Sequence, residues 1–132
     1  MLKGRKEKNL ANKIKNMLLK RGFLVDVSVS KKTNSVYLKI DNGACPTIRI
    51  SDHRNDKSKS KFNMIKNYTG KRMEFQNGQL KKFYNYHMIG RLVADLEIER
   101  SNKIIKYGYS NYKKIRDKDN YNDYYIYNKQ VA

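Results

Sequence analysis

Three short stretches decide the fold of this chain: FLVDVSVS at residues 23–30, VYLKI at residues 36–40 and TIRIS at residues 47–51. In each stretch every second residue is apolar, which is the pattern of a β-strand with one buried face. Short polar segments separate them, as expected for strands joined by tight turns. The pattern therefore predicts an antiparallel meander whose apolar residues face a single core.

Amphipathic helices are predicted on either side of these strands. Apolar residues at helical spacing predict a first helix over residues 6–21, with Gly22 as its stop. A broader apolar stripe predicts a second, longer helix over residues 79–101. It consists of Leu80, Phe83, Tyr84, Met88, Leu92, Val93 and Leu96. Residues 62–68 are the candidate for a fourth strand.

These elements indicate an α+β fold: an N-terminal helix, a three- to four-stranded antiparallel sheet and a long second helix. We expect residues 1–106 to form this core domain. Residues 107–132 hold seven of the eleven tyrosines, interleaved with lysine and arginine. In this extension Tyr107 and Tyr109 alternate like strand residues, and residues 124–127 are a candidate for another short extended piece. We expect the extension to pack on the core or to flank it.

The charge of the chain is strongly unbalanced. Thirty Lys and Arg oppose twelve Asp and Glu, giving a formal net charge of +18. Self-repulsion of this size is relieved by a polyanion, so nucleic acid or a protein that carries it is the expected partner. An AT-rich genome would also favour lysine over arginine, but it would not explain the scarcity of acidic residues. The same charge excludes mimicry of DNA.

Several partner classes are not expected. The longest apolar stretches are only a few residues, so neither a membrane span nor a secretory signal is predicted. Cys45 is the only cysteine and is expected to be a small buried residue in a reducing cytoplasm. One cysteine and two distant histidines do not predict a metal site. No cofactor and no small-molecule substrate are indicated.

Catalysis has one weak candidate. Asp52 and His53 are adjacent, and an acid beside a histidine raises its pKa and favours general-base chemistry, with His87 as a further member. The competing interpretation is that Asp52 and His53 end a strand and hydrogen-bond the next loop. We expect no enzyme, and a small metal-dependent nuclease remains the open alternative.

Binding has better support. Cations contact phosphates while flat rings stack on unpaired bases, so tyrosine among basic residues is typical of nucleic-acid recognition. The same tyrosines would serve protein recognition, or would complete the core. The candidate contacts lie near the third strand and in the extension. They are Arg49, His53, Arg54, Lys57, Lys59 and Lys61, followed by Tyr112, Lys113, Lys114 and Arg116.

Two resemblances bear on function. The order helix, three strands, helix resembles a double-stranded-RNA-binding domain in topology alone, and residues 78–82 supply only a glycine and two lysines where that family has a characteristic basic stretch. The strand pair VYLKI at residues 36–40 and TIRISDH at residues 47–53 resembles a pair found in small phage proteins of low-GC Gram-positive bacteria, including type II anti-CRISPR proteins.

The second resemblance implies an inhibitor that binds a guide-RNA-loaded type II CRISPR effector nuclease, in the cytoplasm of an infected bacterial host. It would block target DNA binding or cleavage, with or without direct contact to nucleic acid. The alternative is a basic DNA- or RNA-binding accessory or regulatory protein of a phage or mobile element. The resemblance assigns no catalytic residue.

Overall fold

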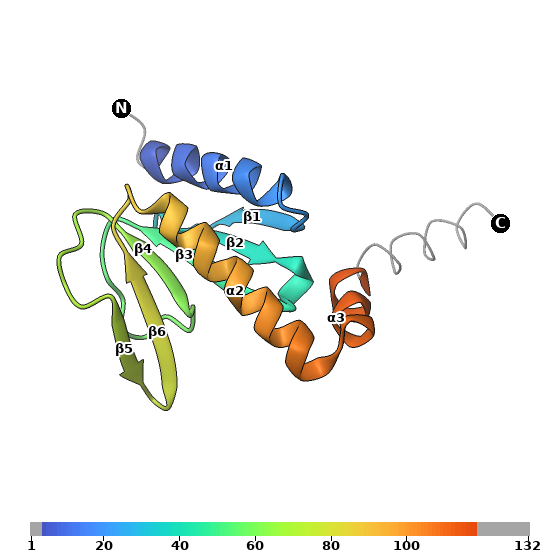
Figure 1. Ribbon diagram of the computed structural model, residues 1–132. Coiled ribbons are helices and arrows are strands. Elements are labelled where there is room, and N and C mark those ends of the chain that lie inside the picture. Colours follow the sequence, from blue (N-terminus) through green and yellow to red (C-terminus); the bar gives the residue numbers. More distant parts are fainter. Residues whose placement is uncertain (1–3, 119–132) are drawn as a thin grey trace, which may run out of the picture.

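The computed structural model describes residues 4–118 and shows one mixed β-sheet with three α-helices (Figure 1). The elements follow in the order α1 (Arg5–Leu19), β1 (Val25–Val29), β2 (Val36–Ile40), the 3-10 helix η1 (Asp41–Gly43), β3 (Cys45–Ser51), β4 (Phe62–Ile65), β5 (Met73–Gln76), β6 (Gln79–Tyr84), α2 (Ile89–Tyr107) and α3 (Tyr109–Arg116). The first helix matches its prediction to within two residues at each end.

The sheet has six strands in the order β1-β2-β3-β4-β6-β5. The pairs β1/β2 and β2/β3 are antiparallel, as predicted for the meander. However, β3/β4 and β4/β6 are parallel, and β5/β6 forms an antiparallel hairpin at the far edge. The class α+β is confirmed, but the prediction of a three- to four-stranded antiparallel sheet is wrong.

The error arises at residues 79–84, which were assigned to the second helix and form β6 instead. Both faces of β6 are covered, so Lys81 and Phe83 are buried on one side and Tyr84 on the other. Burial on both faces removes the strand alternation and leaves an apolar spacing that also fits a helix. The turn Asn77-Gly78, with both φ angles positive at 52° and 78°, joins β5 to β6 as a tight hairpin.

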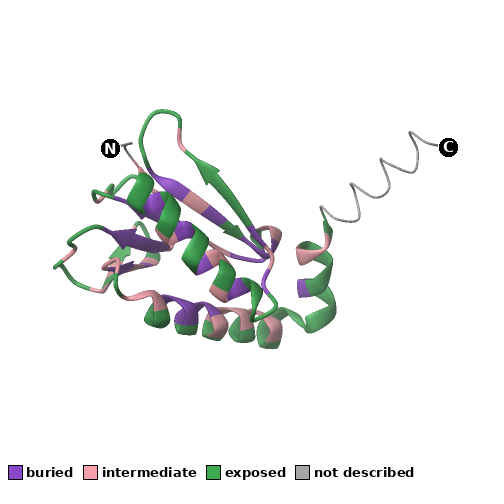
Figure 2. Ribbon diagram, turned by 90° about the horizontal axis from the view of Figure 1, so that it is seen from above, coloured by how far each residue is buried: buried purple, intermediate pink, exposed green. Residues whose placement is uncertain are grey.

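The two long helices cover the same face of the sheet. Helix α1 contacts β1 and β2, and α2 contacts β3, as Figure 1 shows. Figure 2 shows that buried residues line the helix sides facing the sheet, while the outer helix surfaces are exposed. Among residues 4–118 no helix is long and apolar enough to cross a lipid bilayer.

The outer strands β1 and β5 are only partly covered by the two helices. In β1, Val25 is buried, whereas Val27 and Val29 are exposed although all three lie in phase. In β5, Met73 and Phe75 are exposed, and Phe75 retains 78% of its surface. The two helices therefore shield the centre of the sheet and leave apolar side chains along both outer strands.

The start of the predicted extension is helical. Residue 107 ends α2, and the following α3 packs against η1. Tyr107 and Tyr109 therefore belong to helices rather than to a strand, because Gly108 at φ 88° breaks the chain direction between them. The predicted extended piece at 124–127 lies outside the described residues.

Candidate polyanion-binding surface

Arg49 does not lie on the surface. It points to the sheet face opposite Ile48, but only 2% of it is exposed. Its guanidinium donates to the carbonyl of His53 at 3.3 Å and to the hydroxyl of Ser35 at 3.3 Å, and Nε has no partner among the described residues. These hydrogen bonds show that Arg49 stabilises the end of β3.

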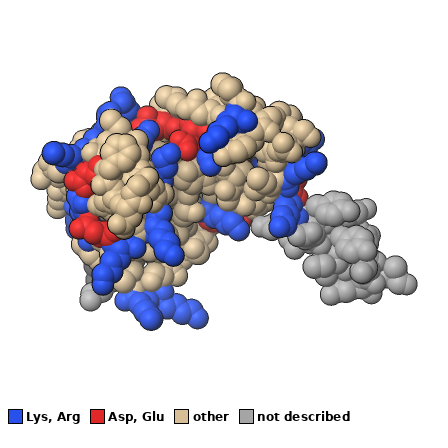
Figure 3. Space-filling model, turned by 90° about the horizontal axis from the view of Figure 1, so that it is seen from below, with Lys and Arg blue, Asp and Glu red and all other residues tan. Residues whose placement is uncertain are grey.

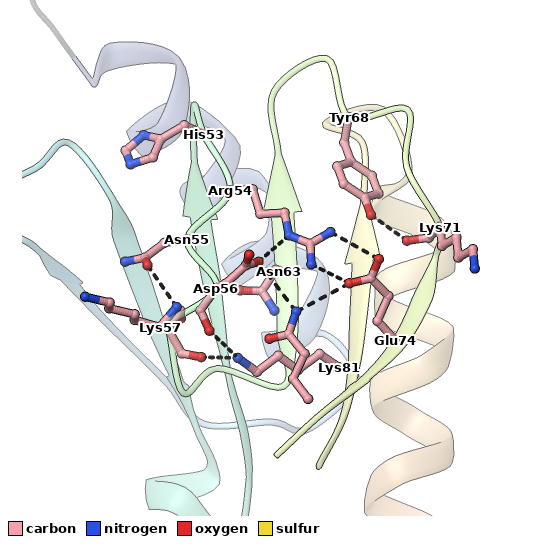
Figure 4. A network of polar contacts seen from close by, with 12 residues as sticks. His53, Arg54, Asn55, Asp56, Lys57, Asn63, Tyr68, Lys71, Glu74 and Lys81 are labelled. Carbon is pink, nitrogen blue, oxygen red and sulfur yellow. Dashed lines mark hydrogen bonds and ion pairs between the residues drawn. The ribbon is translucent and has the colours of Figure 1, made fainter. Parts of the chain in front are cut away.

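Arg54 is fixed by the network drawn in Figure 4. Its guanidinium is paired with the carboxylates of Asp56 and Glu74, and it lies 4.7 Å from the ring centre of Phe83. The hydrogen bond from Arg54 lowers the pKa of both carboxyl groups below the ordinary range. This arrangement attaches the loop after β3 to the hairpin β5/β6, so Arg54 acts within the fold.

Lys81 on β6 also holds the loop after β3 against the hairpin. Its ammonium group is buried and donates to the carbonyl of Asp56 at 3.3 Å and to the carbonyl of Ser58. The backbone of residues 56–58 is therefore held against β6. Figure 4 shows Lys57 pointing away from this network, as expected for a surface cation on an ordered loop.

The pair Asp52 and His53 lies at the surface beyond β3. Asp52 Oδ1 and His53 Nδ1 are 2.7 Å apart, and each side chain is more than half exposed. This hydrogen bond lowers the pKa of Asp52. His87 follows β6, which is parallel to β3 and ends at the same edge of the sheet. Within residues 4–118 no cluster of three metal-ligating side chains accompanies them.

Lys59 and Lys61 share one cleft. It has a volume of about 310 Å³ and is lined by Pro46, Thr47, Lys59, Ser60, Lys61 and Gln79. The Nζ of Lys61 lies 3.0 Å from a carboxylate oxygen of Glu99 on α2. Two of the predicted contacts are thus brought together beside hydroxyl and amide groups.

The predicted contacts of α3 divide into two kinds. Tyr112 is buried, and its hydroxyl donates to the carboxylate of Asp41 and lies 3.1 Å from the sulfur of Cys45. Burial raises the pKa of this phenol, and that of the Cys45 thiol to about 11. Tyr112 therefore belongs to the core, which is one of the alternatives given above for the tyrosines.

Lys113 and Lys114 point outward. They line a hollow of about 410 Å³ together with Ser110, Asp117 and Lys118. Arg116 instead pairs with Asp117, its immediate neighbour. The hollow beside α3 is therefore lined by three lysines and one acidic side chain.

The acidic residues are largely used inside the fold. Asp41 and Glu7 are buried, and the ion pairs of the described chain include Arg21–Glu97, Arg54–Glu74, Arg91–Asp95, Lys61–Glu99 and Arg116–Asp117. No carboxylate among residues 4–118 pairs with Lys57, Lys59, Lys113 or Lys114. Figure 3 shows lysine and arginine side chains spread over one face, with acidic side chains gathered in a few groups.

Sequence reasoning missed the residues that organise the loop. Phe83 is part of the apolar stripe of the predicted second helix and Lys81 lies within the same predicted helix, whereas Glu74 lies in no predicted element. The Asn77-Gly78 pair was the available signal, because this dipeptide between two possible strands favours a hairpin. Placing the hairpin would have put Glu74 and Lys81 side by side, as their register shows.

Comparisons of the chain with protein-family models, with curated proteins and with solved structures found no match.

Proposed function

We propose that this chain is a non-enzymatic inhibitor that binds a guide-RNA-loaded type II CRISPR nuclease through basic surfaces. The observation that carries the proposal is the loop at residues 52–60. The pairing of Arg54 and the buried Lys81 hold this loop, while Lys57 and Lys59 have no carboxylate partner among the described residues. A pre-ordered basic loop loses little conformational entropy when it binds a polyanion.

The route of inhibition is competition. Such a nuclease holds its RNA–DNA duplex in a positively charged channel and recognises the backbone of that duplex. A protein of net charge +18 is repelled by the channel itself and attracted to the guide RNA within it. Contact with exposed guide phosphates would occupy the place where target DNA pairs. The resemblance of residues 36–40 and 47–53 to anti-CRISPR strands supports this choice of partner.

The second candidate is a basic nucleic-acid-binding protein that needs no nuclease. Phe75 favours it, because an aromatic ring with 78% of its surface exposed is suited to stacking on an unpaired base. Lys71 and Arg72, which precede β5, would supply phosphate contacts nearby. This candidate predicts binding to naked RNA or DNA.

The two candidates are separated by one set of binding and cleavage measurements. The inhibitor predicts tight binding to the guide-loaded nuclease and loss of target cleavage when the chain is in excess. The second candidate predicts that the chain binds naked RNA as tightly as it binds the guide-loaded nuclease. Its affinity for RNA should fall steeply as the salt concentration rises. Undiminished cleavage across several nuclease orthologues would contradict the inhibitor proposal.

The double variant Lys57→Ala plus Lys59→Ala tests the loop itself. Both side chains are exposed, so the fold should be retained. We expect inhibition to weaken about tenfold or more, because two charge-assisted contacts are lost. The matched control is Lys13→Ala plus Lys20→Ala, which removes the same charge from exposed positions on α1 and at its C-terminal cap. Equal weakening by both double variants would mean that net charge rather than the loop is responsible.

A further inference from the structure

The cleft that holds Lys59 and Lys61 lies at the amino ends of the parallel strands. Thr47 is near the start of β3, Lys61 directly precedes β4, and Gln79 begins β6. Because the three strands run in the same direction, their first residues lie together at one end of the strands. This end is the lower side of the molecule in Figure 1 and faces the viewer in Figure 3.

The lining of the cleft is rich in hydrogen-bond donors and lacks carboxylates. Its polar side chains are two ammonium groups, two hydroxyls and one amide. Within residues 4–118, the side chains of Thr47, Lys59, Ser60 and Gln79 make no hydrogen bond or ion pair with one another or with other groups. A cation would find no anionic ligand here, whereas an anion would find up to five donor groups.

The walls of the cleft are held in place before any ligand arrives. Lys81 holds the carbonyl of Ser58, and the amide of Asn63 donates to the carbonyl of Ser60 at 2.8 Å. The backbone is therefore fixed on both sides of Lys59. Donors held in fixed positions bind an anion with little reorganisation.

The Lys61 ammonium group is positioned by a carboxylate on its other side. Glu99 lies 3.0 Å from Lys61 Nζ, and its side chain is only 16% exposed. This ion pair directs Lys61 but also neutralises part of its charge. A terminal phosphate carries more negative charge than one carboxylate and has three free acceptor oxygens, and a backbone phosphate still offers two, so several donors of the cleft can be used at once.

We propose that this cleft binds a single phosphate group of a nucleotide chain, with Lys59 and Lys61 as the charged contacts and Thr47 and Ser60 as hydroxyl donors. The proposal builds on the polyanion-binding role inferred above, but it requires no nuclease. The two lysines of the basic loop therefore differ in role. Lys59 lines the cleft and contacts the phosphate, whereas Lys57 does not line the cleft.

The test is a titration of the whole chain with inorganic phosphate, followed by amide chemical shifts and compared with chloride at equal ionic strength. We expect saturable shifts at Thr47, Lys59, Ser60 and Lys61. Lys59→Ala should weaken binding about tenfold, while Lys57→Ala, the matched loss of charge two residues away, should change it less than about twofold. Equal effects of both variants, or shifts spread evenly over all lysines, would overturn the site.

Two further measurements complete the test. Glu99→Gln removes the competing carboxylate, so it should tighten phosphate binding; unchanged binding would remove Lys61 from the site. Single-stranded oligonucleotides with and without a 5′-phosphate then identify the source. Preference for the 5′-phosphorylated form assigns a terminal phosphate, equal binding assigns a backbone phosphate, and binding of neither overturns the proposal.

This result stands apart from nuclease inhibition. Loss of phosphate binding in Lys59→Ala with inhibition intact would uphold the phosphate site and remove it from the inhibitory contact. Absence of phosphate binding in the unaltered chain, with inhibition present, would overturn the site and leave the proposed function standing.

Discussion

Two polar networks fix the irregular parts of this fold, and they differ in burial. At one corner, the fully buried carboxylate of Asp41 accepts from the backbone N–H of Leu24 at 2.8 Å and from the hydroxyl of Tyr112, and so joins α3 to η1. On the opposite sheet face, Arg54 pairs with Asp56 and Glu74 to hold the loop at 52–60. Both networks join segments that are far apart in the sequence.

The difference lies in what happens when a partner is removed. Loss of the Asp41 carboxylate takes the acceptor from the partly buried Leu24 N–H and the strongest acceptor from the buried Tyr112 hydroxyl, where water has little access. Loss of a partner at Arg54 leaves partly exposed groups that water can reach, and ion pairs open to water contribute little to stability. The Asp41 corner should therefore determine whether the chain folds, and the Arg54 network should determine how ordered the basic loop is.

The largest effect is expected for Asp41→Ala. It leaves the Leu24 N–H without its acceptor and leaves the Tyr112 hydroxyl with only the weak sulfur contact of Cys45, and should lower the free energy of unfolding by about 3 kcal/mol. Urea denaturation measures the change. Tyr112→Phe is the milder control and should cost about 1–2 kcal/mol, because it removes only the hydroxyl. A change in Asp41→Ala no larger than that in Arg54→Ala would contradict the comparison.

The second largest effect is expected from alkaline pH, which should lower the stability of the same corner through Cys45. The pKa of Cys45 rises on folding from its ordinary value of 9.0 to about 11, chiefly because of burial. Between these values the unfolded chain has lost the proton while the folded chain retains it, so stability falls as pH rises. Over this interval Cys45 alone should cost about 2 kcal/mol by pH 11.

Denaturation at pH 8, 9, 10 and 11 measures this loss. The variant Cys45→Ala should show a shallower decline than the unaltered chain, although the buried tyrosines still contribute. The matching chemical observation is slow alkylation of the Cys45 thiol at pH 8 in the folded state. Rapid alkylation would show that the thiol is not held protonated.

Lys81→Met should have an intermediate effect. The substitution retains the buried stem but leaves the carbonyls of Asp56 and Ser58 without the ammonium donor. We expect a loss of about 1–2 kcal/mol in the free energy of unfolding. Lys82→Met, at the neighbouring and partly exposed position, is the control and should cost less. Equal losses would show that Lys81 does not hold the loop.

The smallest effect on stability is expected for Arg54→Ala, with a clear local consequence. Removing the two ion pairs releases the loop, so amide hydrogen exchange at Lys57 and Ser58 should accelerate by on the order of tenfold. The amide of Ser58, which donates to the carbonyl of Asn55 at 3.0 Å, is the most direct probe. Unchanged exchange would mean that Lys81 alone orders the loop.

Local patterns predicted the parts of the fold that local physics controls. Ile48 and Ile50 face the core as their alternation indicated, and α1 ends near Gly22 as its stop signal indicated. The parallel pairing of β3 and β4 was not predictable in this way. Only ten residues separate Ser51 from Phe62, whereas a parallel crossover usually needs a dozen or more and contains a helix.

The candidate site was predictable by position but not by role. Lys57, Lys59, Lys113 and Lys114 lie on the surface as expected of uncompensated lysines. Nothing in the sequence separates them from Arg54, because its partner Glu74 is twenty residues away on a strand that was not predicted. Arg49 alternates with the core-facing Ile48 and Ile50, which places it on the other face of β3, and the loop that follows covers that face.

The open edges of the sheet have a consequence for solubility. An exposed edge strand is a template for pairing with another copy, and β1 and β5 present Val27, Val29, Met73 and Phe75 along such edges. A net charge of +18 keeps copies apart at low salt, where the screening length is about 30 Å at 0.01 M. Neutralising that charge on a polyanion removes the repulsion. We therefore expect this protein to stay dispersed alone and to condense when its positive charge is saturated.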